Sequence, residues 1–173
     1  MRKIVITVFT FLVCGFASAG QLSWAYNPAG QPSQFSEQQM LQAIDSAINS
    51  WGACGISSGY QGLTTQTPQH GRDNLVVFGW SNTVSQNGQS GMAHTMYATR
   101  NGYILPGADV MLSATSLTRR PSMLGRVLGH EVGHVVGFSQ HSQSPSSLMY
   151  VTSVNTSTPS QQDISDCRSF NLY

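Results

Sequence analysis

HEVGHVVGFSQH, residues 130–141, carries the strongest signal in this sequence. Residues four apart lie on one face of a helix, so His130 and His134 can each place a ring nitrogen roughly 2.0–2.1 Å from one zinc ion. Glu131 lies one position further round the helix, where its carboxylate can reach a water molecule on the metal as a general base. The segment therefore predicts a metal-binding helix with Glu131 as the catalytic residue.

A third ligand is expected after the helix ends, because the next helical turn cannot supply it. Gly137 permits the backbone to reverse, and His141 follows four residues later. Imidazole suits zinc, whereas the neutral amide of Gln140 binds it weakly. We therefore predict His141 as the third ligand. A chance match of the motif on a surface helix is the alternative interpretation of the whole segment.

These residues resemble the long zinc-binding motif of the metzincin metallopeptidases. Within that clan the chain is most similar to the matrixins. Ser142 follows the third histidine as it does in that family, and Pro145 and Leu148-Met149-Tyr150 match the Met-turn. The resemblance implies a zinc endopeptidase that binds an extended substrate along the strand near Met92-Ala93-His94. It also implies that Met149 packs beneath the metal.

The chain departs from the matrixin pattern in three places. Three residues instead of two separate Gly137 from His141, and a loop can absorb the extra one by bulging. Of the residues that hold a second, structural zinc in many matrixins, only His94 has a match, and Val110 stands near the place of another histidine. Acidic residues are too few to indicate calcium-binding loops. One catalytic Zn²⁺ is therefore the expected cofactor, without a second zinc or calcium.

Arg126 lies four residues before His130 and is expected to project on the same helix face. By the matrixin resemblance, this position reaches the pocket for the substrate residue that follows the cleaved bond. A solvated arginine is the alternative.

The rest of the chain predicts an α+β fold. A long first helix is expected to begin at Ser36 with Gln39 as its capping partner, and a last helix at Ser160 with Asp163. Pro121 suits the first turn of the zinc-binding helix. The strands are expected at the segments Leu22–Tyr26, Leu75–Phe78, Met92–Tyr97 and Ala108–Leu112. With the resemblance added, this becomes a metzincin-like mixed twisted sheet with an active-site helix carrying HExxH, a Met-turn and a C-terminal helix.

The N-terminus has the pattern of an export signal. Arg2 and Lys3 precede an apolar run, and Ala17-Ser18-Ala19 offers a cleavage site. We predict a signal peptide at 1–19, cleaved near Ala19, a single zinc metallopeptidase catalytic domain at 20–173, and a secreted protein, extracellular or periplasmic. An N-terminal membrane anchor is the alternative. Two cysteines then remain, Cys54 and Cys167, which an oxidising compartment would join in a disulfide unless they are separate thiols.

Charge excludes several classes of partner. Removal of Arg2 and Lys3 from the eight basic residues leaves six arginines against seven acidic residues, a net charge of about −1. No basic stripe for nucleic acid and no basic amphipathic helix for a membrane is present. A monomer acting on protein or peptide substrates is expected. The rival functions are a secreted zinc-binding protein without peptidase activity and a zinc hydrolase of cell-wall peptides.

Overall fold

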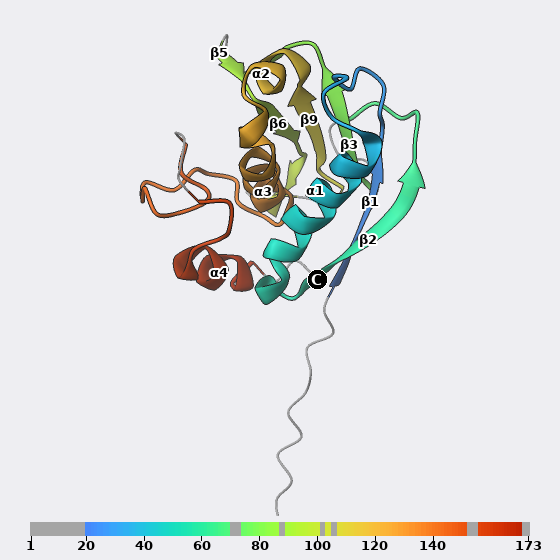
Figure 1. Cartoon of the computed structure of the whole chain (residues 1–173). Coiled ribbons are helices and arrows are strands. Elements are labelled where there is room, and N and C mark those ends of the chain that lie inside the picture. Colours follow the sequence, from blue (N-terminus) through green and yellow to red (C-terminus); the bar gives the residue numbers. More distant parts are fainter. Residues whose placement is uncertain are drawn as a thin grey trace, which may run out of the picture.

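The computed structural model describes residues 20–69, 74–86, 89–100, 103–104, 107–151 and 156–170, so the predicted signal peptide lies outside the described residues. A five-stranded sheet with the order β2-β1-β3-β9-β6 forms the frame (Figure 1). Three neighbouring pairs are parallel, and β6 runs antiparallel to β9 at one edge. The predicted mixed sheet is confirmed. Its strands are β1 (Gly20–Tyr26), β2 (Ile56–Leu63), β3 (Val76–Ser81), β6 (Ala93–Met96) and β9 (Asp109–Ser113).

Two short hairpins accompany this sheet. Strands β4 (Val84–Gln86) and β5 (Gln89–Gly91) form one of them, and β7 (Thr99–Arg100) and β8 (Tyr103–Ile104) form the other. Both are antiparallel.

Helices α1 (Glu37–Ser50) and α3 (Leu124–Val135) pack against each other on one face of the sheet (Figure 1). Ser36 caps α1 in the predicted way, because its side chain accepts a hydrogen bond from the Gln39 backbone while the Gln39 side chain accepts one from the Ser36 backbone. This reciprocal pair satisfies two donors that the first turn leaves free. The α+β class and the long first helix are therefore confirmed.

The core lies between this helical layer and the sheet. The indole nitrogen of Trp51, just after α1, donates to the carbonyl oxygen of Gly129 in α3 at 2.9 Å. That buried hydrogen bond ties the two helices together. The largest fully buried side chains are Trp24, Trp51, Tyr26, Phe78, Met40, Ile44, Ile48, Leu112, Leu117, Leu128, Leu148 and Met149.

The structure differs from the sequence-based prediction before the metal-binding helix. A short helix α2 (Ala114–Arg119), capped by Ser113, precedes a 3₁₀ turn η2 (Pro121–Met123), and α3 begins only at Leu124. Pro121 thus starts a tight turn and not the first α-helical turn. The residues of α2 include two threonines and a serine, which have weak helix propensity, so this element had no clear sequence signal.

Helix α4 (Gln161–Arg168) is the last described helix, and it lies below α3 in Figure 1. Ser160 and Asp163 form the predicted capping box at its start. The disulfide between Cys54 in η1 (Gly52–Cys54) and Cys167 joins α4 to the end of α1, as predicted. None of the described helices has the length and apolar character needed to cross a membrane.

Candidate metal centre

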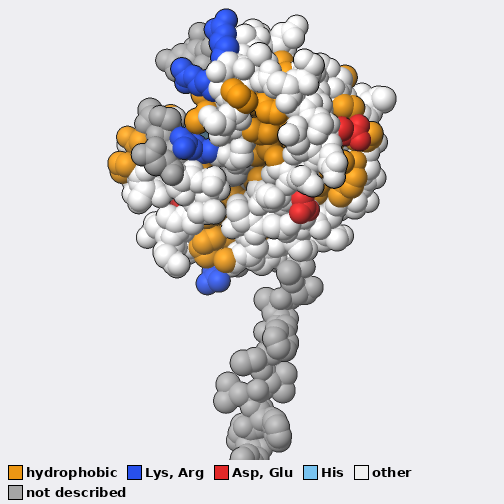
Figure 2. All heavy atoms as spheres, viewed as in Figure 1, with side chains coloured by type: hydrophobic (Ala, Val, Ile, Leu, Met, Phe, Trp, Pro, Cys, Tyr) orange, Lys and Arg blue, Asp and Glu red, His pale blue; other side chains and the backbone are white. Residues whose placement is uncertain are grey.

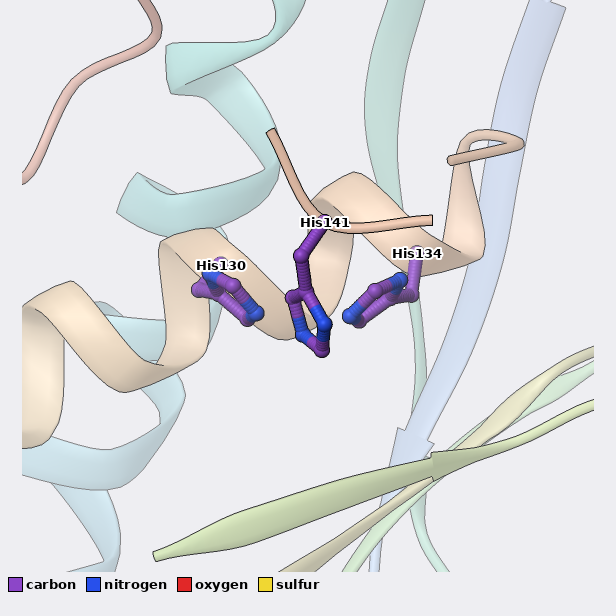
Figure 3. A group of neighbouring side chains, drawn as sticks. All are labelled: His130, His134 and His141. Atoms are coloured by element: carbon purple, nitrogen blue, oxygen red, sulfur yellow. The ribbon is translucent and has the colours of Figure 1, made fainter. Parts of the chain in front are cut away.

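Three histidines from two segments converge on one point. His130 and His134 project from α3, and His141 comes from the segment that follows it (Figure 3). Their ring centroids are 5.0 to 5.2 Å apart. Potential ligand nitrogens of all three lie within 4.8 Å of one another. A group of three such atoms could hold a metal ion.

Backbone carbonyls orient the two helical imidazoles. The Nδ1 atom of His130 is 2.8 Å from the carbonyl oxygen of Leu148, and the Nδ1 atom of His134 is 2.6 Å from that of Phe138. A carbonyl oxygen can only accept a hydrogen bond, so each Nδ1 carries the proton. The unprotonated Nε2 atoms are then free for a metal, which is the usual arrangement of zinc-binding histidines.

The end of α3 depends on Gly137. Its φ of 117° lies in the region that favours glycine. Its N–H donates to the carbonyl oxygen of His134, and the N–H of Phe138 donates to that of Gly133. This reversal places the Phe138 carbonyl oxygen within hydrogen-bond distance of the His134 Nδ1 atom. The segment that carries His141 begins here. The predicted role of Gly137 as a helix terminator is confirmed.

The loop that contains Met149 lies beneath α3. Met149 is fully buried, and a Cβ atom built on Gly133 would meet its Sδ atom at 2.1 Å. The N–H of Ser142 donates to the Met149 carbonyl oxygen at 2.8 Å, and Ser142 forms a parallel bridge with Tyr150. The segment after His141 is thus fixed to the same loop whose Leu148 carbonyl orients His130.

Asp163 anchors this loop to α4. Its buried carboxylate accepts hydrogen bonds from the Ser147 hydroxyl at 2.5 Å and from the Leu148 N–H at 2.9 Å. It also accepts one from the Ser160 N–H at 2.8 Å, as the capping box requires. One carboxylate therefore serves both the helix start and the loop under the histidines.

Glu131 is buried beside the histidines. The Thr95 hydroxyl on edge strand β6 lies 2.6 Å from its Oε2 atom and 3.2 Å from its backbone oxygen. The shorter distance is that of a good O–H···O hydrogen bond from the hydroxyl to the carboxylate. The carboxylate is therefore held towards β6, next to the histidine cluster.

The surroundings of His134 and His141 favour their neutral form. Burial is the main cause that lowers the pKa of His134, and burial also lowers the pKa of His141, followed by repulsion from His130. Neutral imidazole is the form that binds metals. Among the described residues no fourth histidine, cysteine or carboxylate joins the three histidines. The three histidines could therefore hold a metal ion, and a set of three protein ligands is the number found in catalytic zinc sites.

Other predicted residues lie outside this cluster. His94 is half-buried on β6 and is not a member of the cluster, and Gln140 is exposed immediately before His141. Val110 is fully buried in β9. Arg126 is half-exposed on α3, one turn before His130, and its predicted pocket role stays a prediction.

The sequence did not predict that Thr95 and Asp163 contribute to the surroundings of the histidine cluster. Thr95 contacts Glu131 across 36 positions of sequence, and Asp163 contacts Leu148 across 15. Asp163 had a sequence signal, but only as a helix-capping residue. Thr95 is a hydroxyl residue in a short strand, a pattern too common to indicate a partner.

Comparisons with known proteins identify the fold and the family of this chain. A solved structure titled "GM1 bound form of the ECX AB5 holotoxin" is similar in fold, with a TM-score of 0.54 and 12% sequence identity, over 87% of this chain and 80% of that one. At this identity the likeness shows the fold alone. No curated protein matches the chain. The sequence profile of the matrixin family matches residues 18–171, nearly the whole chain, and the protein therefore belongs to the matrixin family.

Proposed function

We propose that this matrixin is a secreted zinc-dependent endopeptidase, with one zinc ion held by His130, His134 and His141. The matrixin family consists of zinc metallopeptidases, and the histidine cluster could bind a metal. The observation that carries the proposal is the buried Glu131 carboxylate beside a cluster that has three ligands among the described residues. A structural zinc site usually has four protein ligands, so this set favours catalysis over a purely structural role.

The zinc site and Glu131 have separate roles in the proposed peptide hydrolysis. Bound zinc would act as a Lewis acid on water and on the scissile carbonyl group. Glu131 takes a proton from the attacking water as its oxygen bonds to the carbonyl carbon. Glu131 then delivers that proton to the amide nitrogen as the carbon–nitrogen bond breaks. The buried position of Glu131 keeps it close to the cluster throughout.

Strand β6 is the proposed binding site for the substrate chain. Among the residues that the structure describes, β6 pairs only with β9 in the five-stranded sheet and leaves its other edge unpaired in that sheet. An extended peptide could add to this edge as a further strand, with main-chain hydrogen bonds supplying affinity. Because Thr95 of the same strand contacts Glu131, a peptide on β6 would lie close to the general base.

The loop Ser147–Tyr150 is proposed as the Met-turn of this matrixin. The burial of Ser147, Leu148 and Met149, the close packing of Met149 on Gly133 and the contact of the Leu148 carbonyl with His130 support that assignment. Met149 would form a packed floor under the metal without binding it.

Export is supported by two independent features. Residues 1–19 have the composition of a signal peptide, and the disulfide between Cys54 and Cys167 fits an oxidising compartment. Charged side chains are few on the face that Figure 2 draws, and the sequence has eight Lys and Arg against seven Asp and Glu, so nucleic acid is not proposed as a partner. A monomer acting on protein or peptide substrates is the proposed form.

Metal content measured together with hydrolysis tests this function. The purified mature protein should contain one zinc per chain and should cleave casein or a proteome-derived peptide library. A chelator should stop the cleavage, and added zinc should restore it. Zinc-loaded protein that cleaves neither proteins nor library peptides would support the rival function of a zinc-binding protein. Cleavage restricted to cell-wall peptides would support the other rival.

A further inference from the structure

We infer that Thr95 is a positioning residue, whose hydroxyl holds the Glu131 carboxylate in one orientation beside the histidine cluster. The inference deepens the proposed function and rests on it for the role of Glu131. Thr95 is 2% exposed and Glu131 is 7% exposed. Their hydrogen bond of 2.6 Å joins the edge strand β6 to the middle of α3.

The hydroxyl has one proton and two acceptors within reach. The carboxylate oxygen of Glu131 at 2.6 Å is closer than its backbone oxygen at 3.2 Å. A charge-assisted hydrogen bond is the stronger one, so the proton is donated to the carboxylate. Among the residues that the structure describes, Thr95 is the only hydrogen-bond donor to this carboxylate.

The two carboxylate oxygens consequently differ. No buried side-chain oxygen or nitrogen of the described residues lacks a partner. Since none of these residues donates to the Oε1 atom of Glu131, that atom is open to solvent. Thr95 therefore fixes Oε2 and leaves Oε1 free to accept a proton, which is what a general base requires.

If Thr95 had a purely structural role, its substitution would weaken the fold, because a buried hydroxyl needs a hydrogen-bond partner. The variants below separate that role from the positioning of Glu131. Thr95→Val removes the hydroxyl while keeping the branched shape, and Thr95→Ser keeps the hydroxyl. Ser116→Ala is a matched control, because it removes the hydroxyl that donates to the Gly91 carbonyl oxygen near β6 without touching Glu131.

Carboxyl-carbon NMR tests the contact without any need for activity. The chain contains two glutamates, Glu37 and Glu131, so protein labelled with ¹³C at the glutamate carboxyl carbon gives two resonances. Glu37 is exposed in the first turn of α1 and serves as an internal reference. We expect Thr95→Val to shift the Glu131 resonance alone and Thr95→Ser to leave it in place. An unchanged Glu131 resonance in Thr95→Val would overturn the inference.

Steady-state kinetics tests the consequence for the reaction. We expect Thr95→Val to lower kcat about tenfold, a part of the roughly 10²–10⁴-fold that a positioned general base contributes. KM, zinc content and the melting temperature should stay close to wild type, Thr95→Ser should restore kcat, and Ser116→Ala should resemble wild type. A loss of activity that only follows lost zinc or lost folded protein contradicts the inference, as does a Thr95→Ser variant as slow as Thr95→Val.

Two outcomes separate this inference from the proposed function. Zinc-loaded wild type that cleaves no peptide refutes the proposed function, and the Glu131 resonance still decides whether Thr95 holds the carboxylate. Active wild type with an equally active Thr95→Val refutes only the inference. Should Thr95→Val fail to fold, Thr95→Ala lacks the same hydroxyl and gives the same two readouts.

Discussion

A Cβ atom built on Gly133 would lie 2.1 Å from the Sδ atom of Met149, far inside any real carbon–sulfur contact. The indole of Trp51 would also be only 2.8 Å away. Gly133 lies between the two histidines of α3, so the absence of a side chain there allows the Met149 loop to pack directly under the metal-binding turn. The Met149 loop therefore packs directly on the backbone of α3 at Gly133.

Gly133→Ala should destabilise the protein by about 1–3 kcal/mol, the usual cost of overpacking a core, and should weaken zinc binding. Gly125→Ala is the control on the same helix, since its Cβ meets nothing within 4 Å. It should instead stabilise the protein by roughly 0.5–1 kcal/mol through helix propensity. Denaturant unfolding of both variants checks this. Equal stability of the two would contradict the close packing.

His141→Ala should lose zinc and activity, because only two histidines would remain to hold the ion. Gln140→Ala should keep both, because the Gln140 side chain is exposed and an amide is a poor zinc ligand. Zinc content after dialysis, measured by mass spectrometry of the metal, separates the two. Loss of zinc in Gln140→Ala alone would move the third ligand by one residue.

Asp163→Asn should destabilise the protein by about 2 kcal/mol or more. The Oδ2 atom of Asp163 accepts from the backbone N–H groups of Leu148 and Ser160, while Oδ1 accepts from the Ser147 hydroxyl. An amide NH₂ in place of either oxygen meets a donor, so the loop under His130 should loosen and zinc affinity should fall.

Asp166→Asn provides the matched control for Asp163→Asn on α4. Asp166 is half-exposed, and its carboxylate accepts a surface hydrogen bond from the Gln162 side chain. The change should stay within about 0.5 kcal/mol of wild type. If both variants unfold at the wild-type denaturant midpoint and bind zinc equally well, the anchoring role of Asp163 is wrong.

A double Cys54→Ser and Cys167→Ser variant should lose about 5 kcal/mol of stability. The disulfide closes a loop across 113 positions, and the entropy of that loop in the unfolded chain sets the expected size of the effect. A reductant should lower the denaturant midpoint of the wild type and leave that of the double variant unchanged. Alkylation of both cysteines in the unreduced protein would show that the disulfide does not form.

Local signals explain which parts of the fold could be predicted from the sequence. The capping boxes at Ser36 and Ser160 and the reversal at Gly137 depend on residues at most five positions apart, so each could be predicted from spacing. The convergence of His141 with His130 and His134 also lies within twelve residues. These features decided the α+β class and the site.

Long-range contacts explain what could not be predicted. Strand β2 has the sequence ISSGYQGL, with no clear alternation, and forms because it pairs with β1 more than thirty positions away. The contact of Thr95 with Glu131 depends on how β6 packs beside α3. No local pattern encodes such a contact, since the same Thr in another strand register would face a different neighbour.

The most direct test of the account compares wild type with Glu131→Gln for zinc content and peptide turnover. The substitution keeps the size of the side chain and an oxygen that can accept from Thr95, but removes the base. We predict one zinc per chain in both proteins and a kcat at least about 10²-fold lower in Glu131→Gln. Near-normal turnover by the zinc-loaded variant would contradict the assignment of Glu131 as the general base and, with it, the proposed mechanism.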